Sequence, residues 1–221
     1  MLRYGIPEYR LSRAVMARDV ASIAELGVVM RNNMTLGYDM SLAELRYEYD
    51  AVLIATGAWS STNVGCPGDG LKGVWGGIDF LTSINRGRRP PIAGKNVAVV
   101  GGGNVAMDVC RLAVRFGAKN VYVIYRRTRD EAPAEDIEIT EAIEEGVTFK
   151  FLTNPSEIIG ENNTVKAVRL QIMELGEPDA SGRRKPIPVE GKEEILDVDL
   201  VISAIGQKFN PVGLEDLALT K

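Results

Sequence analysis

The spacing of apolar residues predicts two helices and two short strands in the first quarter of the chain. Apolar side chains three and four positions apart predict an amphipathic helix over 13–26, and a serine–glutamate capping-box pattern predicts a second helix over 41–47. Continuous apolar runs predict strands at 28–30 and 51–55. The second run is typical of a strand that is buried on both faces.

After a glycine-rich connection at 65–77 and a helix at 78–85, strands and helices alternate regularly. The expected order is strand, helix, strand, helix, strand, at 97–100, 104–116, 121–125, 135–145 and 147–152. This alternation predicts a parallel sheet covered by helices, with right-handed crossovers, and therefore an α/β fold.

Residues 164–197 have a different pattern, which predicts a β-meander with a polar face. Its strands are expected at 165–173 and 187–189, joined by a turn that contains Pro178, Asp179, Ser181 and Gly182. The apolar run at 200–205 then predicts a buried strand that returns to the parallel sheet.

The strand at 97–100 leads directly into a glycine turn, and a helix begins at once. Gly101, Gly103 and Ala106 form the pattern of a dinucleotide-binding turn, in which Gly101 permits the tight bend and Gly103 lets the backbone approach a diphosphate. Ala106 keeps helix and strand close, and the helix N-terminus favours the negative charge. The alternative is a purely structural glycine turn.

The end of the next strand indicates the kind of dinucleotide. An NAD site would place a carboxylate there for the ribose 2′-hydroxyl, but this sequence has Arg126, Arg127 and Arg129. Guanidinium groups suit a 2′-phosphate, so NADPH is favoured over NADH. A solvated basic turn is the alternative reading of these arginines.

Two similar tripeptides follow apolar strands on either side of this unit. They are Ala55-Thr56-Gly57 and Ala204-Ile205-Gly206, and an aspartate precedes each strand. Either one alone would be an ordinary strand end. As a pair, they indicate places where the chain crosses between two nucleotide-binding domains.

Composition excludes several classes of function. The net charge of −4 gives no reason to expect binding to nucleic acid, and no apolar run is long enough to span a membrane. The N-terminus has no secretory signal core, so a cytoplasmic protein is expected. With no histidine and with Cys66 and Cys110 far apart, no metal site or dithiol centre is predicted, and the chemistry is expected to belong to a cofactor.

The chain resembles the small (beta) subunit of glutamate synthase, and also the electron-input region of dihydropyrimidine dehydrogenase and the ferredoxin:NADP transhydrogenases. The resemblance spans essentially the whole chain. It rests on Met1-Leu-Arg-Tyr-Gly-Ile-Pro-Glu-Tyr-Arg-Leu11, Asp50-Ala-Val-Leu-Ile-Ala-Thr-Gly57, Gly101-Gly-Gly-Asn-Val-Ala-Met-Asp108 and Tyr125-Arg-Arg127, with support from Leu175-Gly-Glu-Pro-Asp179 and Ala204-Ile-Gly-Gln207.

This resemblance implies an FAD domain interrupted by an inserted NADPH domain, with hydride passing from NADPH to FAD and electrons leaving through iron–sulfur clusters. It implies FAD contacts for Arg10, for Leu36 and for Ala55, Thr56 and Gly57. For NADPH it implies diphosphate contacts at Gly102, Gly103, Asn104 and Val105, a 2′-phosphate site at Arg126 and Arg127 with Arg129 as a weaker candidate, and a nicotinamide side at Ala204, Ile205 and Gly206.

The resemblance also implies segments that residues 1–221 do not contain: a cysteine-rich iron–sulfur domain, the first FAD glycine fingerprint and a last FAD-contacting segment. The FAD site is therefore expected to be incomplete, and the chain alone inactive. The expected division is a partial FAD lobe at 1–66, a connection at 67–94, a Rossmann-like NADPH domain at 95–206 and the start of a return to the FAD domain at 207–221.

Three matters stay open at the level of sequence. The chain fits either an excised piece of a longer enzyme or a natural short protein, and the strand at 51–55 favours the former because its sheet neighbours are absent. The expected partner is a larger catalytic subunit or the missing iron–sulfur and FAD portions, while self-association is undecided. A non-catalytic NADP(H)-binding module is the alternative from another class.

Overall fold

A five-stranded parallel sheet forms the centre of the molecule. The computed structural model describes residues 1–178, 182–215 and 217, so Asp179 and Ser181 of the predicted turn lie outside the described residues. The strand order is β2-β9-β3-β4-β5, and all neighbours are parallel. The strands are β2 (Val74–Gly76), β3 (Asn96–Val100), β4 (Asn120–Tyr125), β5 (Thr148–Phe151) and β9 (Leu200–Ser203).

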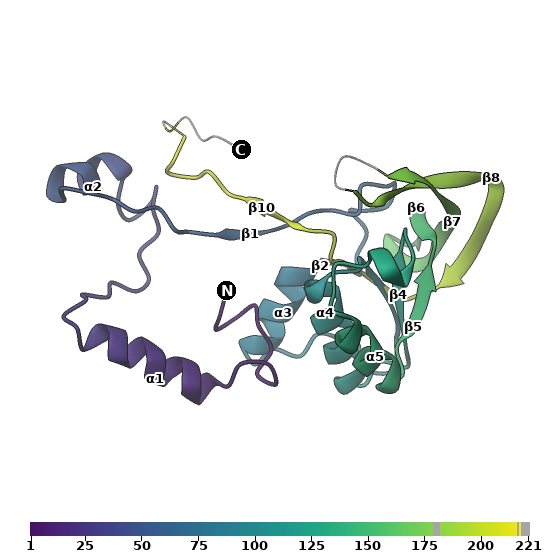
Figure 1. The fold of residues 1–221 in the computed structure, drawn as a ribbon, viewed down its shortest axis with the longest axis horizontal. Helices are drawn as coiled ribbons and strands as arrows, with labels where there is room; N and C mark the ends of the chain where they lie inside the picture. The colour runs from purple at the N-terminus through teal and green to yellow at the C-terminus, as the bar shows by residue number, and fades with distance from the viewer. Residues whose placement is uncertain (179–181, 216, 218–221) are drawn as a thin grey trace.

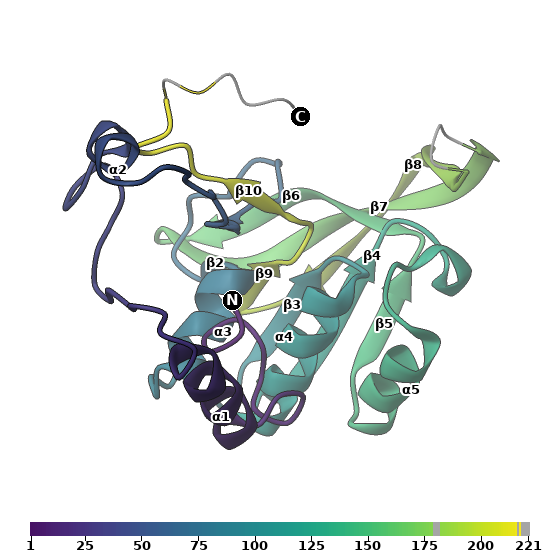
Figure 2. The same cartoon turned by 60° about the vertical axis from the view of Figure 1, so that its left-hand side comes forward.

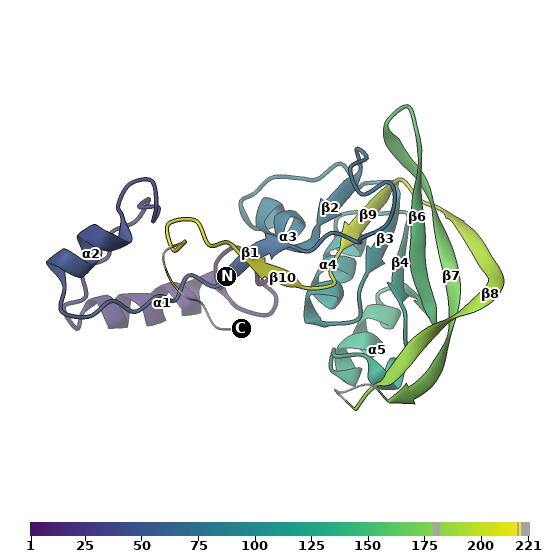
Figure 3. The same ribbon diagram turned by 90° about the horizontal axis from the view of Figure 1, so that it is seen from above.

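Helices cover one face of this sheet and an antiparallel sheet covers the other (Figures 2 and 3). The helices are α3 (Gly77–Asn85), α4 (Asn104–Arg115) and α5 (Asp136–Glu144). The antiparallel sheet is the predicted meander, with order β6-β7-β8, and consists of β6 (Thr153–Glu161), β7 (Thr164–Pro178) and β8 (Arg184–Asp197). The predicted α/β fold with a parallel sheet and a meander is confirmed.

Alternate residues of β3 show why its sequence is continuously apolar. Val97 and Val99 belong to the core under the helices, whereas Ala98 and Val100 belong to the core under the meander. Successive side chains of a strand point to opposite faces, so a strand between two packed layers needs apolar residues at every position. This arrangement fixes the end of β3, and therefore the glycine turn that follows it.

A narrow antiparallel ribbon leads away from the central sheet (Figure 1). It pairs β1 (Ala58–Ser61) with β10 (Gln207–Phe209). Beyond it lie α1 (Arg13–Ala24) and α2 (Leu42–Glu48), in a part of the chain that buries little: of the residues of these two helices, only Met16 is buried. The predicted capping box of α2 is present, with the Ser41 hydroxyl accepting from the Glu44 amide.

The N-terminal residues fold back onto the helical layer. The Asn85 side chain donates to the carbonyls of Tyr4 and Ile6 at 2.8 and 3.3 Å, and the Tyr9 hydroxyl donates to Asp108 Oδ1 at 3.0 Å. The Tyr9 ring lies 4.2 Å from the guanidinium carbon of Arg115. These contacts fix residues 4–9 against α3 and α4.

Two strand predictions are wrong. Residues 28–30 and 51–55 are extended without strand pairing; Val29 is 80% exposed and Leu53 is 91% exposed. An apolar run becomes a buried strand only where another strand pairs with it and other layers cover it. Within the described residues, neither segment has such neighbours.

Four strands were not predicted, and two of them, β1 and β10, form the ribbon. β2 lies in the glycine-rich connection and joins the sheet edge, with Val74 beside Val201, and β6 adds the first strand of the meander. The division into domains stays a prediction, but β2 and α3, within the predicted connection at 67–94, belong to the layers of the central sheet.

Candidate functional site

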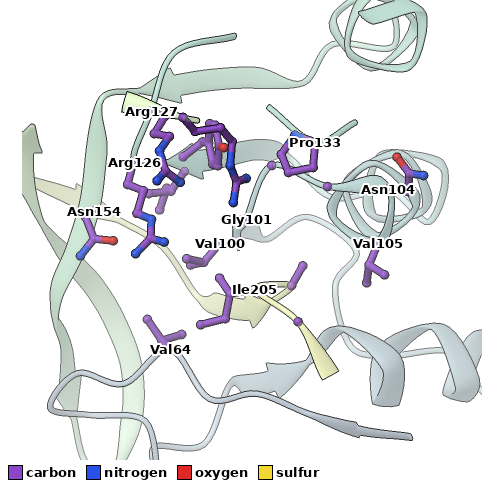
Figure 4. Close-up of a pocket in the computed structure, with 17 residues that line it drawn as sticks. Val64, Val100, Gly101, Asn104, Val105, Arg126, Arg127, Pro133, Asn154 and Ile205 are labelled. Atoms are coloured by element: carbon purple, nitrogen blue, oxygen red, sulfur yellow. The ribbon is translucent and has the colours of Figure 1, made fainter. Parts of the chain in front are cut away.

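A cavity of about 640 Å³ opens at the carboxyl ends of β3, β4 and β9 (Figure 4). In open α/β sheets, this edge is where ligands bind. The structure brings ten of the predicted site residues together in its wall: Gly101, Gly102, Gly103, Asn104, Val105, Arg126, Arg127, Ala204, Ile205 and Gly206. Asn104 and Val105 lie on one side of the cavity and Arg126 on the other.

The three glycines of the turn have different surroundings. Gly101 has φ +140°, and a Cβ there would lie 2.4 Å from the carbonyl oxygen of Ala204. A Cβ on Gly102 would lie 2.6 Å from the ring of Tyr125. A Cβ on Gly103 would meet no atom closer than 4.0 Å, so nothing in the protein requires glycine there. The space beside Gly103 is available for a ligand.

The residues at the start of α4 line the cavity and include backbone amides without an acceptor among the described residues. The amides of Ala106 and Met107 donate to the Gly103 carbonyl at 2.8 and 3.2 Å. The amides of Gly103, Asn104 and Val105 have no acceptor among the described residues. Together with the helix dipole, these donors suit a diphosphate group.

Ala106 is fully buried and lies outside the cavity. It belongs to the core between α4 and the sheet. Its small side chain lets the helix approach the strand, which is the role expected of the last position in the glycine pattern.

The three predicted arginines have three different environments. Arg126 is exposed at the cavity and makes no hydrogen bond or ion pair with the described residues. Arg127 is 4% exposed, and its Nε donates to the carbonyl of Arg184 at 2.7 Å. Arg129 is outside the cavity wall, and its Nε donates to Asp136 Oδ1 at 2.5 Å.

The segment after β9 forms the wall opposite the glycine turn. The Ala204 amide donates to the Val100 carbonyl at 2.8 Å, and the Thr62 amide donates to the Gly206 carbonyl at 3.0 Å. The Ser203 hydroxyl donates to the Thr62 carbonyl at 2.6 Å. These bonds hold the wall between the parallel sheet and the β1–β10 ribbon.

Sequence reasoning missed seven residues of the wall. Val100, Ile124 and Tyr125 end the strands that carry the predicted turns, so strand register alone could have found them. Four others come from distant parts of the chain and carry no sequence signal: Val64, Pro133, Asn154 and Arg183.

The residues expected to contact FAD are not brought together. The Arg10 guanidinium forms ion pairs with Asp108 and Glu138 on the helical layer. Leu36 forms a bridge with Met40, and Ala55, Thr56 and Gly57 are exposed near the ribbon. The described residues therefore bring the candidate NADPH residues together at the glycine turn, whereas the residues expected to contact FAD have separate environments.

The two cysteines, Cys66 and Cys110, are free thiols, one partly buried and one buried. Burial raises the pKa of the Cys66 thiol to about 11 and that of the Cys110 thiol to about 12. A thiol must lose its proton to act as a nucleophile, so the raised pKa values favour the less reactive, protonated form of both thiols near neutral pH. Among the described residues, no group of His, Cys, Asp or Glu side chains is arranged to bind a metal.

Within the described residues, no helix combines the length and the apolar character that crossing a membrane requires.

Residues 14–221 match the family model of the pyridine nucleotide-disulphide oxidoreductases. The chain belongs to this family. The match extends over the glycine turn, the arginines and the wall after β9.

Three relatives illustrate the range of this similarity. The chain is 47% identical to the NADP(+)-dependent formate dehydrogenase subunit beta of Moorella thermoacetica, over 94% of this chain and 30% of that protein. It is 46% identical to the NADPH-Fe(3+) oxidoreductase subunit beta of Geobacter sulfurreducens, over 94% of this chain and 31% of that protein. It is 39% identical to the glutamate synthase [NADPH] small chain of Azospirillum brasilense, over 98% of this chain and 46% of that protein. The chain thus spans less than half of each relative.

Solved structures support the fold. FprA of Mycobacterium tuberculosis, in complex with NADPH, matches with a TM-score of 0.80 at 22% identity, over 96% of this chain and 62% of that one. Thioredoxin reductase of Lactococcus lactis matches with a TM-score of 0.57 at 22% identity, over 76% of this chain and 48% of that one. At this level of identity, the likeness concerns the arrangement of the chain.

Proposed function

We propose that this chain is the NADPH-binding part of a flavoprotein oxidoreductase of the glutamate synthase small-subunit type. The observation that carries the proposal is one cavity that combines amides at the start of α4 with Arg126 at the end of β4, none of which has a partner among the described residues. The amides suit the diphosphate that every nicotinamide dinucleotide has, and Arg126 suits the 2′-phosphate that only NADPH has.

Within this proposal, the protein binds and orients the coenzyme. Gly103, Asn104 and Val105 donate to the diphosphate, and Arg126 binds the 2′-phosphate. Ile205 and Val64 form the apolar wall for the nicotinamide side (Figure 4). NADPH supplies a hydride when bound; this chain's residues fix its position and need neither donate nor accept a proton.

The final electron acceptor is proposed only as a class. The three relatives are named as subunits or chains of NADP-dependent formate dehydrogenase, NADPH-Fe(3+) oxidoreductase and NADPH-dependent glutamate synthase. We propose that electrons pass to FAD and then through iron–sulfur clusters to a larger partner subunit. The chain is 46–47% identical to the formate dehydrogenase and Fe(3+) oxidoreductase subunits, which supports a general electron-input role rather than a role in glutamate synthesis alone.

Calorimetric titration with NADPH and NADH tests the coenzyme assignment. The unaltered chain is expected to bind NADPH more tightly. Arg126→Ala is expected to weaken NADPH binding roughly 10-fold and to leave NADH binding unchanged, because hydrogen bonds to charged groups contribute about 1.5–3 kcal/mol. Arg89→Ala, which removes another exposed arginine that has no ion pair with the described residues, serves as the control. Equal binding of both coenzymes, with no effect of Arg126→Ala, would refute the assignment.

The chain by itself is proposed to bind FAD weakly and to be inactive, because the residues expected to contact FAD are apart. After incubation with FAD and gel filtration, we expect the protein fraction to show no flavin absorbance. A stoichiometric yellow complex would show that these residues suffice for an FAD site.

A further inference from the structure

We infer that Arg183, at the end of the β7–β8 hairpin, binds the NADPH 2′-phosphate together with Arg126, and that Arg127 positions the hairpin. This inference rests on the proposed function and adds a specificity-determining residue to it. Arg183 lines the cavity although it lies 57 positions after Arg126 in the sequence.

The buried side chain of Arg127 connects two parts of the fold. Its side chain is 4% exposed, and its Nε donates to the Arg184 carbonyl at 2.7 Å. Its own carbonyl accepts from the Leu152 amide at 3.1 Å, at the junction of β5 and β6. The guanidinium of Arg127 therefore links the end of β4 to the residue next to Arg183.

A second contact fixes the same end of the hairpin. Arg184 Nε donates to Glu131 Oε1 at 2.5 Å, and Glu131 in turn accepts from the Thr128 amide at 3.2 Å in the short 3-10 helix η1 (Arg129–Glu131). Arg184 is thus held through its carbonyl and through its side chain. Arg183, one residue before it, is consequently kept in the wall of the cavity that Arg126 also lines.

The charges of the wall suit a group with more than one negative charge. Three arginines line the cavity, and no aspartate or glutamate does so among the described residues. A phosphate monoester carries about −1.5 to −2 charges near neutral pH and has three acceptor oxygens. Arg126 and Arg183, both exposed and on different structural layers, supply two cations for such a group.

The affinities of Arg183→Ala for NADPH and NADH test the assignment. The variant is expected to lose about 10-fold in NADPH affinity with NADH affinity unchanged. Lys185→Ala removes an exposed cation from the same hairpin outside the cavity wall and is expected to change neither affinity. Since both arginines bind one phosphate, Arg126→Ala/Arg183→Ala is expected to bind NADPH and NADH equally.

A double-mutant cycle separates positioning by Arg127 from direct binding. Arg127→Met is expected to lower the NADPH-to-NADH affinity ratio in the unaltered chain, but not in the Arg183→Ala background. A further fall of the ratio in that background would make Arg127 itself a ligand and would overturn the inference. Arg127→Lys serves the same comparison if the methionine variant does not fold.

The outcome distinguishes this inference from the proposed function. If Arg126→Ala lowers NADPH affinity and Arg183→Ala does not, the proposed function stands and the role of Arg183 is refuted. If the unaltered chain binds NADPH and NADH equally, the proposed coenzyme assignment is itself refuted.

Discussion

Replacement of Gly101 by alanine is expected to lower the free energy of unfolding by about 3 kcal/mol. The residue has φ +140°, which side chains rarely tolerate, and the new Cβ would lie 2.4 Å from the Ala204 carbonyl oxygen. Backbone bonds hold both sides of this contact: the Gly101 amide donates to Ile124 at 3.0 Å, and the Ala204 amide donates to Val100 at 2.8 Å. A shift that relieves the clash must therefore disturb three strands.

Urea denaturation checks this expectation, with Gly70→Ala as the matched control. A Cβ on Gly70 meets no atom within 4 Å and its φ is not in the left-handed region, so that variant is expected to unfold like the unaltered protein. A Gly101→Ala variant with the same unfolding midpoint as Gly70→Ala would contradict the prediction, because it would show that the turn accommodates the new Cβ without loss of stability.

The sequence predicted the central layers well because their elements are defined locally. The apolar run of β3, the glycine turn and the helical periodicity of α4 are contiguous, and the structure places them in that order. Burial on both faces explains the apolar run, and the close contact with Ala204 explains why the bend needs Gly101.

The sequence could not predict features that depend on distant neighbours. The run at 51–55 has the composition of a buried strand, but pairing is a property of two segments, and no described segment pairs with it. Conversely, the three residues of β2 are too few to give a pattern, and they form a strand because β9 lies beside them.

The same reason limits what sequence says about the candidate site. Arg126, Arg127 and Arg129 are similar in sequence, yet one is exposed at the cavity, one is buried and one is paired with Asp136. Arg183 reaches the cavity only because a long hairpin folds back over the sheet. Which arginine meets the ligand is thus decided by tertiary contacts.

Replacement of Gly103 by threonine is expected to weaken binding of both NADPH and NADH by at least about 100-fold without destabilising the fold. Gly103 has extended backbone angles, φ −104° and ψ −179°, at the N-cap of α4, where threonine is as favourable as glycine. The added side chain would occupy the space beside the turn, and its hydroxyl would accept from a first-turn amide. Loss of two charged hydrogen bonds, at about 1.5–3 kcal/mol each, gives this magnitude.

Titration and thermal unfolding of Gly103→Thr, with Gly70→Thr as the control, separate binding from stability. The diphosphate is common to both coenzymes, so both affinities are expected to fall together, in contrast to Arg126→Ala, which affects NADPH alone. Unchanged affinities in Gly103→Thr would place the diphosphate away from the start of α4. A large fall in the unfolding temperature would instead show that Gly103, like Gly101, is required by the fold, which the open space around its Cβ position argues against.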